Sequence, residues 1–93
     1  MSNIPIDLKS VKREEIDREI LRTGMIAELD AVNLYEQMAA LTQNEHIRKA
    51  LLDIAREEKT HVGEFQALLL KLDEEQAKEL EEGRKEIEEL TKH

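Results

Sequence analysis

Three residues whose side chains bind metals lie at helical spacing in this chain of 93 residues. Glu28 interrupts one apolar stripe, and Glu58 and His61 interrupt a second one. The pattern Glu-x-x-His places both of its side chains on one helix face, one turn apart. Since burying an ionised carboxylate without a partner costs several kcal/mol, a cation is expected between the two stripes. Two carboxylates and an imidazole suit iron, manganese or zinc better than calcium, which prefers oxygen ligands alone.

The elements that position these residues are predicted to be helices. Apolar residues recur at steps of three and four and nowhere alternate, so the expected fold class is all-α. We predict helices over residues 12–41, 44–72 and 74–90. The expected units are a flexible N-terminal tail over residues 1–11, an antiparallel helical hairpin over 12–72 and a shorter acidic C-terminal helix over 73–93.

Short polar segments separate the predicted helices. Thr42 and Glu45 have the spacing of a capping box, which would start the second helix. Asp73 can cap the third helix in the same way, with Gln76 three residues later as its partner. A turn as short as residues 42–45 forces the first two helices to run antiparallel.

The hairpin brings the metal-binding residues to the same height. Glu28 lies 15 residues before position 43, and Glu58 lies 15 residues after it. At about 1.5 Å of rise per residue, both carboxylates stand about 22 Å from the turn on facing helices. A di-iron carboxylate bundle takes a Glu from each of two helices and a Glu-x-x-His from each of the other two. One chain supplies half of that set, so a complete site requires two copies of Glu28, Glu58 and His61.

Other roles for these residues remain open at this point. Glu58 can instead pair across an interface with a basic side chain, namely Arg22, Arg56 or Lys59. Such pairing would leave a plain helical dimer without a metal. Tyr35 lies two turns beyond Glu28 on the same stripe and serves either as a core aromatic or as a hydrogen-bond donor near the ligands.

Composition excludes several classes of function. The chain has 14 basic and 22 acidic residues and a formal net charge of −8, which has the wrong sign for binding nucleic acid. It contains no cysteine, so disulfides, thiolate zinc sites and cysteine nucleophiles are excluded. No apolar run reaches the ~18 residues of a membrane span. A chain this short buries a limited core and profits from a partner subunit or a metal.

The paired motifs resemble those of the encapsulated ferritins, the ferritin-like proteins associated with encapsulin nanocompartments. The resemblance covers about residues 22–73 and rests on the segment 28–37 and on Arg56-Glu-Glu-Lys-Thr-His61. It implies a ferritin-like four-helix bundle that is completed by dimerisation, and an annular decamer built from such dimers. It also implies a di-iron centre at the dimer interface, with Glu28, Glu58 and His61 as the iron ligands and Tyr35 beside them.

The resemblance implies a function and a location. The expected activity is that of a ferroxidase, which oxidises Fe(II) to Fe(III) with dioxygen for iron storage inside an encapsulin shell in the cytoplasm. Family members can carry acidic residues just before and two after the first ligand, where metal is taken up. Those positions are Ala27 and Asp30 here, so only Asp30 is available for that role.

Two features of the sequence bear on how far this expectation extends. The chain ends at Thr91-Lys92-His93 with neither a shell-loading peptide nor a shell domain, as expected of a shortened cargo protein or of the cargo part of a fusion. The absence of cysteine removes the thiolate iron site that rubrerythrin-like peroxidases use for electron transfer. The alternatives are a manganese catalase or peroxidase of the same fold and a non-enzymatic acidic helical assembly module.

Overall fold

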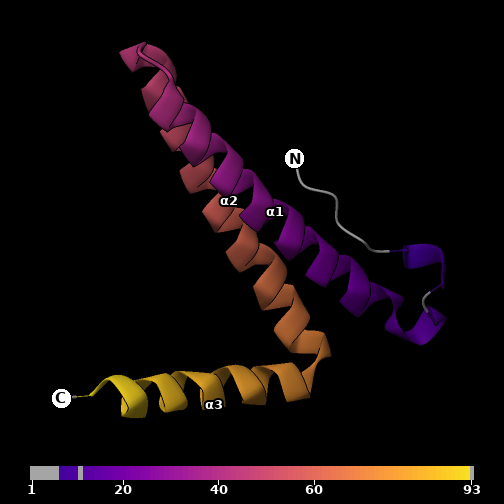
Figure 1. The fold of residues 1–93 in the computed structure, drawn as a ribbon. Coiled ribbons are helices and arrows are strands. Elements are labelled where there is room, and N and C mark those ends of the chain that lie inside the picture. Colours follow the sequence, from indigo (N-terminus) through magenta and orange to yellow (C-terminus); the bar gives the residue numbers. More distant parts are fainter. Residues whose placement is uncertain (1–6, 11, 93) are drawn as a thin grey trace.

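The computed structural model describes residues 7–10 and 12–92, and regular helices account for nearly all of them (Figure 1). The α-helices are α1 over Ile16–Leu41, α2 over Glu45–Leu72 and α3 over Glu74–Thr91. Two 3₁₀ turns, η1 over Leu8–Ser10 and η2 over Arg13–Glu15, precede α1. The described residues contain no strand, so the predicted all-α class with a hairpin and a shorter third helix is confirmed.

The start of the first helix differs from the prediction. Regular α-helix begins at Ile16 rather than at residue 12, after the tight turn η2, whose flanking Lys12 makes no capping hydrogen bond with its side chain. Lysine offers no side-chain acceptor to the free N–H groups of a helix start, so a 3₁₀ turn leads into α1 instead. Of the predicted tail over 1–11, residues 1–6 and 11 lie outside the described residues.

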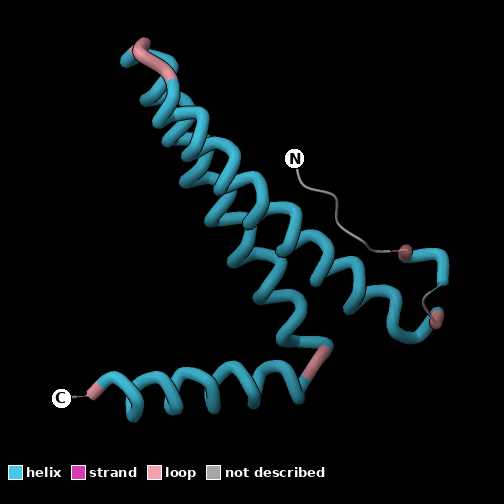
Figure 2. Tube along the Cα trace, viewed as in Figure 1, coloured by secondary structure: helices cyan, strands magenta, loops and turns pink. Residues whose placement is uncertain are grey.

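The hairpin of α1 and α2 buries a single narrow seam. The two helices run antiparallel and side by side (Figure 2). Their buried apolar residues within the described part of the chain are Val32, Ala39, Ala55 and Leu69. Two helices alone can cover only one stripe of each, which leaves apolar side chains on both outer faces half exposed. A second layer is therefore needed to bury the remaining apolar surface.

The turn between α1 and α2 corrects one prediction. Asn44, not Thr42, is the N-cap of α2, because its side-chain oxygen accepts hydrogen bonds from the backbone N–H groups of His46 (2.9 Å) and Ile47 (3.1 Å). Thr42 instead accepts a hydrogen bond from the N–H of Asn44 at 3.1 Å. The Arg48 guanidinium closes the turn by donating to the backbone carbonyls of Ala39 and Thr42. Threonine and asparagine are both favoured at N-caps, and Asn44 takes this role because it lies directly before the first residue of α2.

Asp73 alone connects α2 to α3. Its side chain caps α3 by accepting a hydrogen bond from the N–H of Gln76 at 2.9 Å, as the sequence predicts. This backbone N–H, together with the Arg22 guanidinium, holds the pKa of Asp73 below its ordinary value in spite of burial. The chain turns sharply at this residue, so α3 runs away from the hairpin (Figure 1).

Helix α3 continues through Gly83 without a break and has no buried residue. Its surface carries ion pairs spaced three and four residues apart, including Arg84 with Glu81 and with Glu88. Such pairs support a helix that has little packing of its own. None of the helices in the described part of the chain is long and apolar enough to cross a membrane.

Replacing Asn44 by alanine is expected to lower the free energy of unfolding by about 0.5–2 kcal/mol, the usual loss when an N-cap side chain is removed. Thr42→Ala is the matched control, because it removes an acceptor from the same turn while leaving the cap of α2 in place. Chemical unfolding followed by circular dichroism measures both. A larger loss for Thr42→Ala than for Asn44→Ala would contradict the assignment of the cap.

Candidate metal centre

The three metal-binding residues converge between the middle turns of α1 and α2. Glu28 comes from α1, and Glu58 and His61 come from α2, one turn apart. Each offers one ligand atom, and these atoms all lie within 4.8 Å of one another. Among the described residues, no other set of three or more histidine, aspartate or glutamate side chains comes this close together. The structure thus brings together the three residues that sequence spacing singles out.

The distances within this group suit a shared cation better than direct hydrogen bonds. The Nδ1 atom of His61 lies 3.4 Å from Oε2 of Glu28 and 3.6 Å from Oε2 of Glu58. Strong charge-assisted hydrogen bonds are about 2.7–2.9 Å long. Two ligand atoms that each lie about 2.1 Å from one metal ion, at angles of about 90–110°, stand about 3.0–3.4 Å apart. The donor set therefore fits a first-row metal ion with small adjustments of the side chains.

The group is half covered by protein. The Glu28 and Glu58 side chains are 21% and 19% exposed, whereas the His61 side chain is 44% exposed. The carboxylates thus lie inside the seam and the imidazole lies at its edge. A metal ion held by these three ligands would keep coordination positions open on that side.

The basic residues that are alternative partners of Glu58 pair elsewhere within the described chain. Their contacts are Arg22–Asp73 at 2.7 Å, Arg56–Asp53 at 2.9 Å and Lys59–Glu36 at 3.2 Å. Among the residues that the structure describes, His61 is the one potential cation within 4 Å of the two glutamates. Two carboxylates opposite one imidazole leave a net negative charge that favours a metal ion.

Gly24 and Phe65 form a close contact beside the group, and sequence reasoning missed it. A Cβ atom at Gly24 would lie 3.0 Å from the nearest ring atoms of Phe65. Gly24 lies one turn before Glu28, and Phe65 lies one turn after His61, on the facing helix. Gly24 and Phe65 are each one turn farther from the hairpin turn than Glu28 and His61, so the same residue count from the turn could have predicted that they face each other. The contact allows α1 and α2 to approach closely next to the ligands.

The remaining candidate residues lie outside the group. Tyr35 is half buried on α1, two turns beyond Glu28, which agrees with either role predicted for it. Asp30 is half buried on α1 and does not belong to the set of converging ligand atoms. Glu57 and Glu64 flank the ligands on α2 and are exposed.

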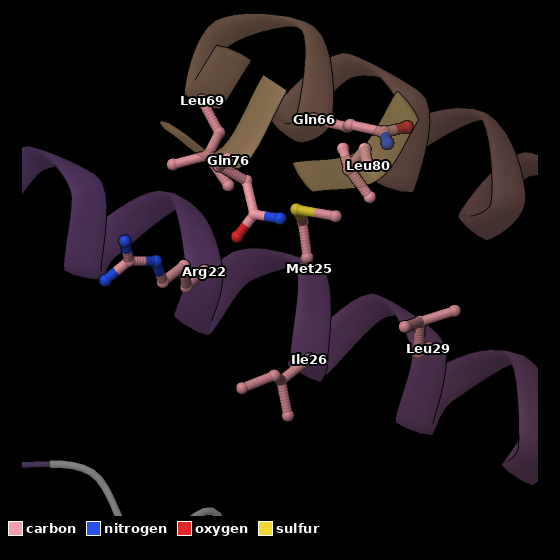
Figure 3. Close-up of a pocket in the computed structure, with 8 residues that line it drawn as sticks. All are labelled: Arg22, Met25, Ile26, Leu29, Gln66, Leu69, Gln76 and Leu80. Atoms are coloured by element: carbon pink, nitrogen blue, oxygen red, sulfur yellow. The ribbon is translucent and has the colours of Figure 1, made fainter. Parts of the chain in front are cut away.

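Hollows lie on two sides of the hairpin. One of about 280 Å³ is lined mainly by aliphatic side chains, including Ile20, Leu68 and Leu72. Leu68 and Leu72 follow His61 by seven and eleven residues, so they share its helix face. A hollow of about 320 Å³ lies between all three helices (Figure 3), with Met25 of α1 opposite Leu80 of α3, and it contains none of the three candidate ligands.

Comparisons with known proteins agree on a family. The family model described as Rubrerythrin matches residues 19–93. A ferritin-like-encapsulin shell fusion protein of Pyrococcus furiosus is 61% identical over 83 residues, which are 89% of this chain and 24% of that protein. The encapsulin nanocompartment cargo protein EncC of Myxococcus xanthus is 37% identical over 76 residues, which are 78% of this chain and 58% of that protein.

A solved structure is also similar. The crystal structure of the encapsulated ferritin domain from Pyrococcus furiosus superposes with a TM-score of 0.83 and 54% identity, and the match covers 96% of each chain. The chain spans about a quarter of the first curated relative and somewhat more than half of the second.

Gly24→Ala is expected to give a protein at least about 1 kcal/mol less stable than Gly63→Ala, although both changes remove a helical glycine. A Cβ at Gly24 meets the Phe65 ring, whereas nothing lies within 4 Å of a Cβ at Gly63. Gly63→Ala should therefore gain up to about 1 kcal/mol from helix propensity alone. Thermal unfolding of both variants measures the difference, and equal stabilities would show that the close contact carries no constraint.

Proposed function

Because this chain belongs to the rubrerythrin family, and within it to the encapsulated ferritins, we propose that it is a ferroxidase that oxidises Fe(II) to Fe(III) with dioxygen. The observation that carries this proposal is the convergence of Glu28, Glu58 and His61 on a half-open face of the hairpin. Iron is the substrate of the reaction, and dioxygen accepts one electron for each Fe(II) that is oxidised.

The site is completed by a second copy of the chain. Three ligands hold a first-row metal incompletely, and the ferritin-like di-iron set requires twice this number. The surface beside the ligands supports dimerisation on this face, because Ile20, Leu68 and Leu72 are 45%, 52% and 52% exposed there. Two hairpins packed through this face would form a four-helix bundle with the ligands of both chains at its centre.

Charge balance supports two iron ions in such a dimer. Four glutamates facing one another carry four negative charges, and two Fe(II) ions carry four positive ones. Without metal, these carboxylates would repel one another across the interface. Dimerisation is therefore expected to depend on a bound divalent ion, and carboxylate ligands favour oxidation since hard oxygen donors stabilise Fe(III).

The residues of the proposed site have two tasks. Glu28, Glu58 and His61 of each chain would together hold the iron ions and supply them with carboxylate and imidazole ligands. The Nδ1 atom of His61 faces the glutamates, so Nδ1 is the imidazole nitrogen placed to act as the ligand. The Phe65 ring, packed on Gly24 one turn away, shields the ligands from water on that side.

The proposed setting is the interior of an encapsulin shell in the cytoplasm. The two curated relatives are named as a fusion to an encapsulin shell protein and as an encapsulin cargo protein, which supports this partner. A ring of dimers such as an annular decamer encloses no sealed cavity, so storage of Fe(III) mineral would require the surrounding shell.

The test adds Fe(II) in air to the wild type, to Glu58→Gln and to Glu57→Gln. The last variant removes a neighbouring exposed carboxylate and keeps the proposed ligands, so it is the matched control. We expect ferric absorbance to grow at least about tenfold more slowly with Glu58→Gln, since weakening even the outer partners of metal ligands costs about 10–100-fold. Glu57→Gln should match the wild type.

Oligomeric mass recorded with and without a chelator tests the shared site separately. Loss of dimers in chelator and in Glu58→Gln, but not in Glu57→Gln, would support ligands from two chains. Iron oxidation at the protein-free rate in all three proteins would reject the ferroxidase. Turnover of peroxide with manganese alone would point to the catalase alternative, and mass unchanged by metal would point to a plain assembly module.

A further inference from the structure

The corner between α2 and α3 consists of one residue, and a single residue cannot by itself fix the direction of the helix that follows. Helix α3 lies near the hairpin only at its own start, where Gln76 and Leu80 line a hollow shared with α1 and α2, and it then extends away (Figure 1). Its surface ion pairs stabilise it as a rod along its length. Whatever holds the corner therefore sets the direction of all 18 residues of α3.

Asp73 ties together the pieces that meet at this corner. One of its carboxylate oxygens accepts the hydrogen bond from the N–H of Gln76 in α3. The other oxygen accepts a hydrogen bond from the Arg22 guanidinium of α1 at 2.7 Å. Asp73 is also the one buried charged residue among those described, with 8% of its surface exposed. The Arg22 side chain is 44% exposed, so the pair is a partly exposed one whose loss would weaken the compensation of the Asp73 carboxylate.

We propose that the Arg22–Asp73 pair is a clamp that fixes the direction of α3 relative to the hairpin. The proposal goes beyond the ferroxidase site. On α1, Arg22 shares a helix face with Ile26 and Leu29. Glu28 lies about a third of a turn around the helix axis from Arg22 and so belongs to another face. The clamp and the candidate metal centre therefore act on different faces of the same hairpin.

The charges around the clamp favour the pair. Arg22 and Asp73 line a polar hollow together with Arg18, which adds a second positive charge that acts on Asp73, and with three further carboxylates, those of Glu15, Glu19 and Glu75. Within this hollow, Arg22 is the cation that donates a hydrogen bond to Asp73, and Arg18 pairs with Glu15. The pair also joins residues 51 positions apart, which no helix-internal ion pair of this chain does.

Closure of the clamp also shapes the apolar hollow between the three helices. Arg22 lines this hollow, and α3 covers it with Gln76 and Leu80, which face Met25 across it (Figure 3). Rotation of α3 about Asp73 would remove these two side chains from the hollow. The clamp thus determines where the apolar residues of α3 stand relative to those of α1.

Distances between α1 and α3 test this directly. The chain has no cysteine, so Gln37→Cys and Glu86→Cys, both at exposed positions, provide the only spin-label sites. Labelled chains are diluted with unlabelled ones, and double electron–electron resonance reports the distance within one chain. Arg22→Met keeps the apolar stem of arginine without its charge, and Asp73→Asn keeps an oxygen that can cap α3. Both variants should broaden the distribution of distances between the two labels. The population of chains with a reoriented α3 should rise about fivefold, which corresponds to the upper end of the free energies that partly exposed ion pairs contribute.

Asp53→Asn is the matched control, because it weakens an Arg–Asp pair that lies within α2 alone. A distribution that stays narrow in this control and broadens in Arg22→Met and Asp73→Asn supports the clamp. Unchanged distributions in both clamp variants would overturn it. Asp73→Ala, which removes the cap of α3 together with the ion pair, is measured beside them. Broadening confined to this variant would also overturn the clamp, because it would assign the corner to the helix cap alone. Equal broadening in Asp53→Asn would overturn it too, because it would indicate general loosening.

Discussion

Two carboxylates that face one imidazole inside a thin helical hairpin are the constraint on which the rest of this molecule depends. Glu28 and Glu58 lie mostly within the seam, and the basic residues nearest in sequence are engaged by other carboxylates in the described chain. A seam only two helices wide cannot shield these charges or neutralise them from a third side. The proposed di-iron dimer would complete the hairpin with a metal and a partner at once.

The small core has the same origin. Ala39 and Ala55 are two of the buried apolar residues in the described part of the chain, and their small side chains let the two helix backbones approach closely along the seam. Gly24 and Phe65 extend this approach next to the ligands. The apolar side chains that remain outside, such as Leu68 and Leu72, continue the face that carries His61. Part of the apolar surface left unburied in one chain thus lies on the same side as the candidate ligands, as a site shared between two chains would require.

Much of this was predictable because the turn is short. Counting residues from the turn placed Glu28 opposite Glu58 and His61, and the structure brings them together; the family resemblance drawn from the same motifs is confirmed by the comparisons. The cap of α2 was predicted wrongly, since Thr42 and Asn44 both suit a cap and only the backbone path decides between them. Local pattern predicted Asp73 as a cap, but not its pairing with Arg22, which depends on how the helices fold back in space.

The contrast between these outcomes shows which parts of such a molecule are local. Periodicity and turn length determine which residues of a hairpin face each other, because both act over a few residues and repeat regularly. No repeating pattern determines the direction of α3. Asp73 alone connects it to α2, and Asp73 is bound by Arg22, which lies 51 residues earlier in the sequence. If that contact fixes the corner, the face of α1 that carries Arg22 governs the placement of α3, while the face that carries Glu28 governs metal binding. A single helix then separates the geometry of α3 from the chemistry of the site, so each can change with little effect on the other.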